Sequence, residues 1–360
     1  MRIGLIVGPW FTVPPEKYGG TERVVDALAR ALVDAGHDVL LATASDSTCP
    51  VPQLPGFASS QPDEVGLTLS ELAHVIKAYR DMGDVDIIHD HTLAGPLYSH
   101  RPQDVPVVTT IHGQLSAPAA TLYRDMAKDT AIIAISHDQC SRVSGLPVAA
   151  VIHHGIDLSA VSVGQGAGGY ACFVGRMCPD KGLMEAVDIA REAGVPLRIA
   201  AKMHASEEQS YFREVVQPAL GSGEEFLGEL SDPEKFELMG DAIALLNPIQ
   251  WHEPFGLVMI EALATGTPVL ATPMGAAPEI VRHGITGFVG STGELAACLE
   301  RVPSLSREAC RRSVEESFSS GRMAAEHVDL YGRLIGKFKD KSLPVKHHLQ
   351  DNQRQAPINL

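Results

Sequence analysis

The sequence lacks the features that mark secreted and membrane-spanning proteins. Its 360 residues contain only six cysteines, none of them in a Cys-x-x-Cys pair, so it shows no zinc ribbon and no evident disulfide framework. The N-terminal apolar stretch meets Pro9 too early to form a signal-peptide core, and no apolar run approaches the roughly 18–20 residues that span a bilayer. A cytoplasmic protein that does not cross a membrane is therefore expected.

Positive charge is also scarce. The chain has 29 Lys and Arg residues against 44 Asp and Glu residues, and its formal net charge is −15. A nucleic-acid-binding protein would show a basic excess, so nucleic acid is not an expected partner. The hydrophobic fraction of 45% and the charged fraction of 20% are those of a soluble globular protein. A length of 360 residues predicts two domains of ordinary size.

Short apolar runs alternate with segments of helical periodicity along the chain. Residues 3–7 form the first run, and residues 170–174 restart the pattern after a glycine-rich stretch at residues 164–169. This alternation predicts two α/β domains with doubly wound parallel sheets. We expect domains at residues 1–163 and 170–317, joined by a linker at 164–169. Residues 318–336 have the pattern of an amphipathic helix, and the polar, basic residues 337–360 predict a flexible tail.

Two carboxylates follow one buried strand of the second domain. Residues 244–249 contain a short apolar run that is stopped by Asn247-Pro248, and a polar loop with Glu253 follows. A helix is expected from Gly256 onward with Glu261 inside it. The first amides of that helix, those of Phe255, Gly256 and Leu257, have no intrahelical partner and can meet an anion or a hydroxyl. At about 1.5 Å per residue, Glu261 lies roughly 8–9 Å along the helix axis. This spacing suits a long polyhydroxylated ligand; the alternative is a solvated loop and a surface helix position.

Two cations flank a second loop. Residues 170–174 predict a strand, and Gly175-Arg176 and Lys181-Gly182 follow it at the start of the next helix. A bidentate guanidinium and an ammonium beside free helix amides suit one diphosphate group. The alternative is a solvated turn with two surface cations.

Paired glycines follow the first strand. Gly19 and Gly20 come before a helix for which Thr21 is the expected N-cap, with Glu22 in the first turn. The segment is not a GxGxxG fingerprint, and no Walker lysine follows it. Glycines at this place let a backbone approach a ligand, although a flexible turn before a helix would look the same.

Three histidines, His89, His91 and His112, follow expected strands and are residues of the kind that bind zinc. None has a partner at the spacing of a helical His-x-x-x-His site. We therefore expect no metal site.

Nine positions around the two carboxylates carry a family resemblance. The segment Glu253-Pro-Phe-Gly-Leu-Val-Met-Ile-Glu261 resembles the Glu-x7-Glu signature of retaining glycosyltransferases of family 4. The loop with Arg176 and Lys181 resembles the pyrophosphate-binding loop of that family. Residues 153–157 resemble its His-Asn-Gly-Val-Asp segment, with His154 in place of Asn. The resemblance extends to about residue 331 and implies the GT-B fold, in which two Rossmann-like domains face a central cleft and the C-terminal helix packs back on the first domain.

The resemblance also implies roles for individual residues. Glu253, His112, Arg176 and Lys181 would be the catalytic group, with Glu253 and His112 beside the donor sugar. The expected donor-binding and nucleotide-binding residues are Gly19, Gly20, Arg176, Lys181, Gly228, Phe255, Gly256, Leu257 and Glu261. Within this set Glu261 would bind the ribose, and Gly228 would border the base. His91 and Thr21 are expected on the acceptor side.

The activity implied is metal-independent transfer of a hexose from a nucleotide diphosphate sugar, UDP-linked by preference, to an acceptor hydroxyl with retention. Arg176, Lys181 and helix amides can stabilise the diphosphate that leaves, so no cofactor is expected. The acceptor could be a glycan, a lipid or a natural product. Two alternatives stay open: a hydrolase or epimerase of nucleotide sugars with the same architecture, and a non-catalytic subunit that binds a sugar nucleotide.

Overall fold

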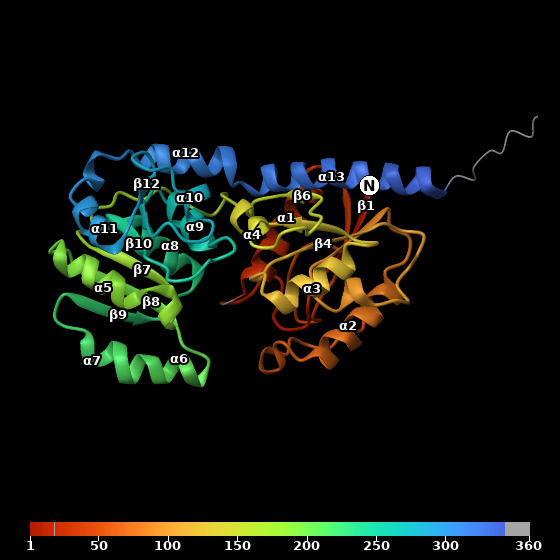
Figure 1. Ribbon diagram of the computed structural model, residues 1–360, viewed down its shortest axis with the longest axis horizontal. Coiled ribbons are helices and arrows are strands. Elements are labelled where there is room, and N and C mark those ends of the chain that lie inside the picture. Colours follow the sequence, from red (N-terminus) through yellow and green to blue (C-terminus); the bar gives the residue numbers. More distant parts are fainter. Residues whose placement is uncertain (18, 343–360) are drawn as a thin grey trace, which may run out of the picture.

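The computed structural model of the protein describes residues 1–17 and 19–342. Figure 1 shows two lobes side by side, the N-terminal lobe on the right and the C-terminal lobe on the left, with helices α12 (Arg307–Ser317) and α13 (Ser320–Ser342) along one edge of both. Each lobe contains one six-stranded sheet. Every pairing between named strands is parallel. The prediction of two α/β domains with parallel sheets is confirmed.

The N-terminal sheet has the strand order β2-β1-β3-β4-β5-β6. Its strands are β1 (Arg2–Ile6), β2 (Asp38–Ala42), β3 (Ile87–Asp90), β4 (Val107–Thr110), β5 (Ala131–Ala134) and β6 (Ala150–Val151). The helices of this lobe are α1 (Gly20–Asp34), α2 (Thr68–Asp81), α3 (Ala117–Met126) and α4 (His137–Ser141), with short helical turns η1 (Pro62–Glu64) and η2 (Gly95–Leu97).

The C-terminal sheet has the order β12-β11-β10-β7-β8-β9. Its strands are β7 (Ala171–Arg176), β8 (Leu197–Lys202), β9 (Glu224–Gly228), β10 (Ala244–Asn247), β11 (Val269–Ala271) and β12 (Gly287–Val289). The helices are α5 (Leu183–Glu192), α6 (Ser206–Tyr211), α7 (Gln217–Ala219), α8 (Asp232–Asp241), α9 (Leu257–Ala264), α10 (Ala277–Ile280), α11 (Thr292–Leu299) and α12, with η3 (Pro179–Lys181), η4 (Phe212–Val216) and η5 (Val302–Ser304).

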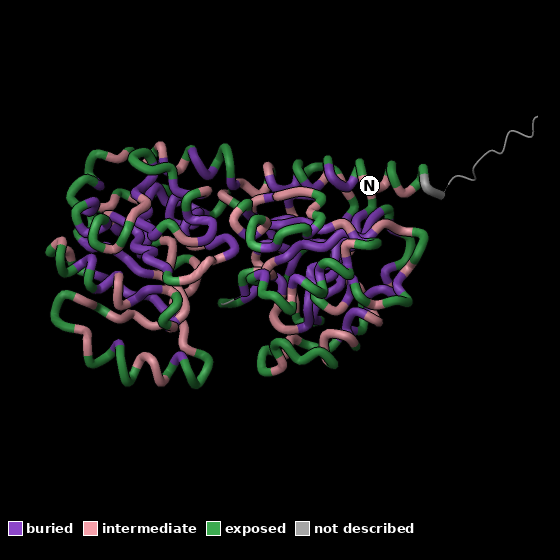
Figure 2. Tube along the Cα trace, viewed as in Figure 1, coloured by how far each residue is buried: buried purple, intermediate pink, exposed green. Residues whose placement is uncertain are grey.

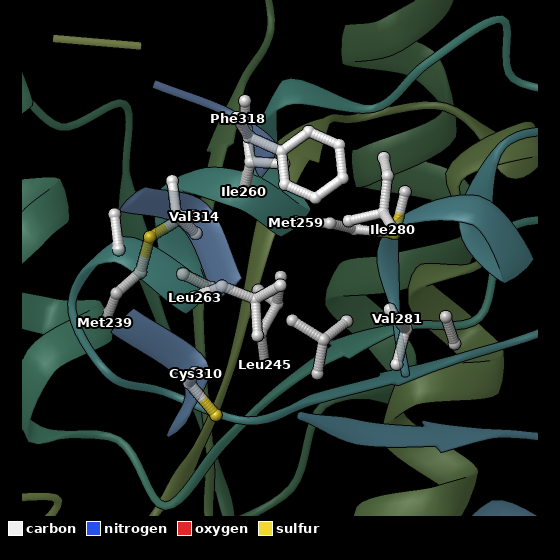
Figure 3. Packing of buried hydrophobic residues seen from close by; sticks show 14 of the residues in the cluster. Met239, Leu245, Met259, Ile260, Leu263, Ile280, Val281, Cys310, Val314 and Phe318 are labelled. Atoms are coloured by element: carbon white, nitrogen blue, oxygen red, sulfur yellow. The ribbon is translucent and has the colours of Figure 1, made fainter. Parts of the chain in front are cut away.

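Both sheets are covered on both faces, so their central strands are buried along their whole length. All four residues of β3, β4 and β10 are buried, and Figure 2 shows the buried chain concentrated in the middle of each lobe. In Figure 3, Met259, Ile260 and Leu263 of α9 pack among side chains of β10, α10 and α12. This packing fixes the helix that carries Glu261.

The strand orders determine where a ligand can bind. In the N-terminal sheet the order reverses between β1 and β3, and in the C-terminal sheet it reverses between β7 and β10. Loops that leave the carboxyl ends of strands at such a reversal run to opposite faces and open a crevice between them. Three of these four strands lead into predicted site segments: Gly19 and Gly20 follow β1, Arg176 ends β7, and Glu253 follows β10.

The linker at residues 164–169 is docked on the C-terminal domain. The amides of Gly164, Gly166 and Gly168 donate to the carbonyls of Thr265, Gly240 and Asp241 at 2.9–3.0 Å. A Cβ atom on Gly164 would lie 2.2 Å from the carbonyl oxygen of Gly240. Glycine is therefore required at residue 164 for close contact between two backbones.

Helix α13 returns the chain to the N-terminal lobe, where it packs along α1. Phe318 and Ser319 form the junction after α12, and Ile156 forms a bridge with Ser319. The helix continues to Ser342, so the irregular tail expected from Lys337 is wrong for residues 337–342; its favourable helical composition and amphipathic pattern simply continue. Residues 343–360 lie outside the described part of the chain.

Helix α1 begins two residues earlier than the sequence indicates. Gly20 is its first residue and Gly19 its N-cap, with no side-chain cap hydrogen bond. The expectation that Thr21 is the N-cap is wrong, because Thr21 already lies within the helix. In the described part of the chain, no helix combines the length and the apolar character needed to cross a membrane.

Arg307 of α12 joins the linker to the second domain. Its guanidinium donates to the carbonyls of Gly164, Gly240, Ala242 and Thr265 and to Oγ1 of Thr267, at 2.7–3.2 Å. Its charged guanidinium thus serves several partly buried backbone acceptors at once.

We expect Arg307→Met to lower the free energy of unfolding by about 2–4 kcal/mol, because hydrogen bonds to a charged group contribute about 1.5–3 kcal/mol each and the acceptors left behind are only partly rehydrated. Thermal or urea unfolding measures the change. The control is Arg333→Met on α13, whose side chain is 52% exposed and pairs only with Asp329 one turn away. Equal losses in the two variants would contradict the role of Arg307.

Candidate functional site

A cavity of about 400 Å³ lies between the two domains. Its N-terminal wall consists of residues that follow β1, β4, β5 and β6, and its C-terminal wall of residues at or after the ends of β7, β8, β9 and β10. Both sheets therefore present their carboxyl ends to the same space, as expected for ligand sites of doubly wound folds. The volume is that of a small-molecule site.

The cavity wall is richer in positive charge than the chain as a whole. Its cationic side chains are those of Lys17, Arg23, Arg176, Lys181, Lys202 and Lys235, and its anionic side chains those of Glu229, Asp232, Glu253 and Glu261. The whole chain, in contrast, has a formal net charge of −15. Cations gathered in a low-dielectric cleft of an acidic protein attract an anionic ligand.

Glu253 and Lys181 are in direct contact. The loop after β10 carries Glu253, and η3 after β7 carries Lys181. Lys181 Nζ donates to Glu253 Oε1 at 2.5 Å, and the two side chains are only 14% and 13% exposed. The other carboxylate oxygen, Oε2 of Glu253, is buried and has no hydrogen-bond partner among the described residues. An acceptor left without a donor is costly, and the site therefore contains an unsatisfied carboxylate oxygen.

The loop after β11 supports Glu253 from behind. The amide of Ala276 donates to the carbonyl of Glu253 at 3.1 Å. Gly275 has φ +58°, and a Cβ atom there would lie 2.2 Å from the carbonyl oxygen of Glu253 and 2.5 Å from its nitrogen. Any side chain at residue 275 would push Glu253 out of position.

Glu261 belongs to a chain of charges that crosses the cleft. Lys235 of α8 donates to Glu261 Oε1 at 2.8 Å and also lies 3.0 Å from Asp232. Asp232 in turn pairs with Arg23 of α1, in the other domain. The Glu261 and Lys235 side chains are 7% and 12% exposed, so solvent screens their attraction only weakly. This chain links the helix that carries Glu261 to the N-terminal domain.

Five imidazoles gather behind the N-terminal wall: His89, His91, His112, His154 and His327. His112 and His154 line the cavity, with ring centroids 5.3 Å apart. Burial lowers the pKa of His112 to about 3 and that of His327 to about 4, and it holds the pKa values of His89, His91 and His154 well below the ordinary value. These rings are therefore uncharged at pH 7.

Most of the residues predicted from the sequence meet at this cavity. Those that line it are Gly19, Gly20, Thr21, His112, Arg176, Lys181, Glu253, Phe255, Gly256, Leu257 and Glu261. Two predicted residues do not line it. Gly228 ends β9, and the next two residues, Glu229 and Leu230, form the wall instead. His91 lies behind His112, to which it is hydrogen-bonded at 2.8 Å.

Several residues at the cavity gave no signal in the sequence. Lys235, Asp232 and Arg23 read as ordinary helix positions, because their partners lie 26 and 209 residues away. The acidic residues near the start of α8 fit a capped helix equally well, so only the packing of α8 against α9 assigns them to the cavity.

The two domains also touch beside the cavity. Glu279 of α10 accepts hydrogen bonds from the amides of His137 and Asp138 at 2.9 and 2.8 Å and from His153 Nε2 at 2.7 Å. Ser136 Oγ donates to the carbonyl of Pro254 at 2.6 Å. Glu279 thus caps a helix of the opposite domain.

In residues 1–17 and 19–342, no group of three or more His, Cys, Asp or Glu side chains has an arrangement suited to a metal ion. His91 and His112 bond each other rather than pointing at a common centre.

Both halves of the chain match models of known protein families. Residues 18–160 match the family model for Glycosyltransferase Family 4, and residues 168–307 match that for Glycosyl transferases group 1. The phosphatidyl-myo-inositol mannosyltransferase of Mycolicibacterium smegmatis is 30% identical over 322 residues, which cover 80% of this chain and 80% of that protein.

Solved structures agree with the fold. AviGT4, a glycosyltransferase involved in avilamycin A biosynthesis, is 25% identical with a TM-score of 0.70 and covers 93% of this chain and 98% of its own. Anabaena HepE in complex with UDP and glucose is 19% identical with a TM-score of 0.70, over 92% of this chain and 99% of its own. The predicted GT-B arrangement is confirmed by these similarities.

Glu22 lies directly beside the cavity residues Thr21 and Arg23, yet it is 5% exposed. Burial raises the pKa of its carboxyl from 4.5 to about 7, partly offset by a hydrogen bond from its own amide. Between these two pKa values the unfolded chain is ionised while the folded one keeps its proton. The contribution of this group to stability is therefore present at low pH and lost as the pH rises through about 7.

Replacing the carboxyl by an amide should remove this pH dependence. As the pH rises from 4 to 8, the free energy of unfolding of Glu22→Gln should increase by up to about 3 kcal/mol relative to that of the wild type. Melting temperatures of both proteins at the two pH values measure the gain. Glu308→Gln, at an exposed carboxylate of α12, controls for the loss of one negative charge. A difference that is the same at both pH values would contradict the burial of an ionisable Glu22.

Proposed function

Because the chain belongs to glycosyltransferase family 4, we propose that it transfers a hexose from a nucleotide diphosphate sugar to an acceptor hydroxyl, with retention at the anomeric carbon and without a divalent metal ion. UDP is the favoured nucleotide. The acceptor is a glycan, a lipid or a small natural product.

One contact carries this proposal: Lys181 Nζ lies 2.5 Å from Glu253 Oε1 inside the cavity. In a nucleotide diphosphate sugar the anomeric carbon is bonded directly to an oxygen of the diphosphate. A site for it needs a cation for the phosphate next to an acceptor for the sugar hydroxyls. The contact between Lys181 and Glu253 supplies both. Oε2 of Glu253, which has no hydrogen-bond partner among the residues that the structure describes, can accept from a hydroxyl.

The proposed reaction develops negative charge on the leaving diphosphate. Arg176, at the end of β7 with a side chain 36% exposed, and Lys181 would stabilise it together with the first amides of α9. These groups are fixed before the substrate arrives, so stabilisation costs little reorganisation. Because these groups provide positive charge at the diphosphate, we propose that no metal ion is needed.

Retention follows if the acceptor attacks on the face that the diphosphate leaves. The bond from the anomeric carbon to the phosphate oxygen breaks, the bond to the acceptor oxygen forms, and the acceptor proton passes to the departing phosphate. Glu253 is held by Lys181 and fits the binding of a sugar hydroxyl better than attack on carbon. No enzyme base is needed in this sequence of events.

The nucleoside end of the donor would lie on the other side of the diphosphate. Glu261, held by Lys235, would accept hydrogen bonds from the ribose hydroxyls, and Glu229 and Leu230 would border the base. The HepE complex with UDP and glucose supports UDP for this end. The M. smegmatis relative is named for transfer to a phosphatidyl-inositol and AviGT4 for a role in natural-product biosynthesis, so these relatives support more than one acceptor class.

Thermal-shift assays with UDP, GDP, dTDP and ADP, with and without EDTA, test the nucleotide. A ligand at about 100 times its dissociation constant should stabilise the protein by roughly 2.7 kcal/mol. We expect UDP to stabilise regardless of EDTA. No stabilisation by any nucleotide would overturn the donor site, and stabilisation only with a divalent ion would overturn metal independence. Measuring the release of nucleoside diphosphate with and without added acceptor distinguishes transfer from hydrolysis. Transfer requires the acceptor, whereas hydrolysis does not.

Lys181→Ala and Glu261→Ala should each lower kcat/KM for the donor by about tenfold or more, because each removes a proposed donor contact. Their far-ultraviolet spectra should stay those of the wild type. Lys128→Ala in the turn after α3, with a side chain 74% exposed, is the matched surface control. If the melting temperature of either cavity variant collapsed, that residue would be structural rather than part of the donor site.

A further inference from the structure

Two imidazoles, one behind the cavity wall and one in it, are joined by a hydrogen bond. His91 follows β3 and is 9% exposed, and His112 follows the neighbouring strand β4. His91 Nδ1 lies 2.8 Å from His112 Nε2. Because both rings are uncharged, one of these nitrogens carries the proton and the other accepts it.

The surroundings of His91 decide which nitrogen carries that proton. The other nitrogen of His91, Nε2, is buried and has no hydrogen-bond partner within residues 1–17 and 19–342. If His112 donated, His91 would have to keep its own proton on Nε2, where a buried N–H group would be orphaned. Orphaned buried N–H groups are rarer in proteins than under-used acceptors. His91 therefore donates from Nδ1 and leaves only a lone pair on Nε2.

The orientation of His112 follows from this. Its Nε2 accepts from His91, so the proton of the neutral ring is on Nδ1. No hydrogen bond to Nδ1 is formed by the described residues, whereas the His112 ring lines the cavity. The nitrogen that remains for a ligand is thus an N–H donor.

We infer that His91 is a positioning residue that locks His112 in the Nδ1–H tautomer, so that His112 offers a hydrogen-bond donor to an oxygen of the sugar. This inference rests on the proposed function for the identity of the ligand, but the tautomer itself does not depend on it. Glu253 would accept from one sugar hydroxyl and His112 would donate to another. Neither ring acts as a base.

The position of His91 is itself supported by a second imidazole, two residues earlier in the chain. The ring of His89 lies 3.9 Å from that of His91, centroid to centroid. His89 Nδ1 is hydrogen-bonded to the hydroxyl of Tyr331 at 2.6 Å, and His89 Nε2 is hydrogen-bonded to Thr110 Oγ1 at 2.8 Å. Helix α13 thereby restrains the ring that restrains His91. Support of this kind keeps a binding group at its productive angle.

Nuclear magnetic resonance of the full chain labelled with ¹⁵N-histidine tests the tautomer without any substrate. Two-bond correlations from the ring carbon protons distinguish a protonated nitrogen from a bare one, and a His112→Gln sample identifies the signals of His112. We expect Nδ1 of His112 to be protonated and Nε2 bare in the wild type. The opposite assignment overturns the inference at once, whether or not any variant folds.

Two substitutions at His91 then test the cause. His91→Leu removes the donor, and the Nδ1–H form of His112 should be lost or mixed. His91→Asn keeps an N–H group near the position of Nδ1 and should restore that form. The control is His327→Leu, at another buried imidazole of the group (4% exposed) whose Nδ1 is bonded to the carbonyl of Met323. It should leave the tautomer of His112 unchanged.

Transfer kinetics give the functional readout. We expect kcat/KM for the donor to fall about tenfold in His91→Leu, equivalent to about 1.4 kcal/mol of transition-state stabilisation, and to recover largely in His91→Asn. The dissociation constant of UDP, which lacks the hexose that is transferred, should not change. The positioning role would be overturned if activity fell while the tautomer of His112 stayed unchanged. It would also be overturned if the affinity for UDP fell by the same factor as kcat/KM. If the wild type used no nucleotide sugar, the proposed function would fail while the tautomer result still stood.

Discussion

Every named strand of the protein runs parallel to its neighbours, and this one constraint decides where its polar residues gather. A parallel strand leaves the sheet at the same edge as its neighbours, so polar residues that end successive apolar runs come together there. Two such sheets face each other, and their edges enclose one cavity. His112, Arg176 and Glu253 meet because each follows a strand.

The charges at the cavity are arranged in pairs before any ligand binds. Lys181 neutralises Glu253, and Lys235 neutralises Glu261. A carboxylate buried alone would lose its charge or destabilise the fold, as the raised pKa of Glu22 illustrates. Pairing keeps Glu253 and Glu261 able to accept hydrogen bonds and keeps Lys181 in the wall of the cavity.

The domains are connected by more than the linker. Glu279 caps α4 of the opposite domain, and α13 carries the chain from the second lobe back to the first, where Tyr331 bonds His89. The relative position of the two walls is therefore fixed by hydrogen bonds at several places around the cavity. A site divided between two domains requires this, because an error of about 1 Å in the position of a binding group is costly to a reaction.

The sequence by itself determined the local order of strands and helices and the two-domain division, because apolar periodicity and glycines act over a few residues. It also picked out Glu253, Glu261, Arg176 and Lys181, which stand at the ends of strands or in nearby loops and helices. It misjudged the start of α1, where no side chain caps the helix, and the end of α13. Only the tertiary structure decided that Lys235 pairs with Glu261, that Arg23 reaches Asp232 and that His91 bonds His112. These contacts join residues 21 to 209 positions apart, and no local pattern encodes a partner that the packing of separate elements brings near.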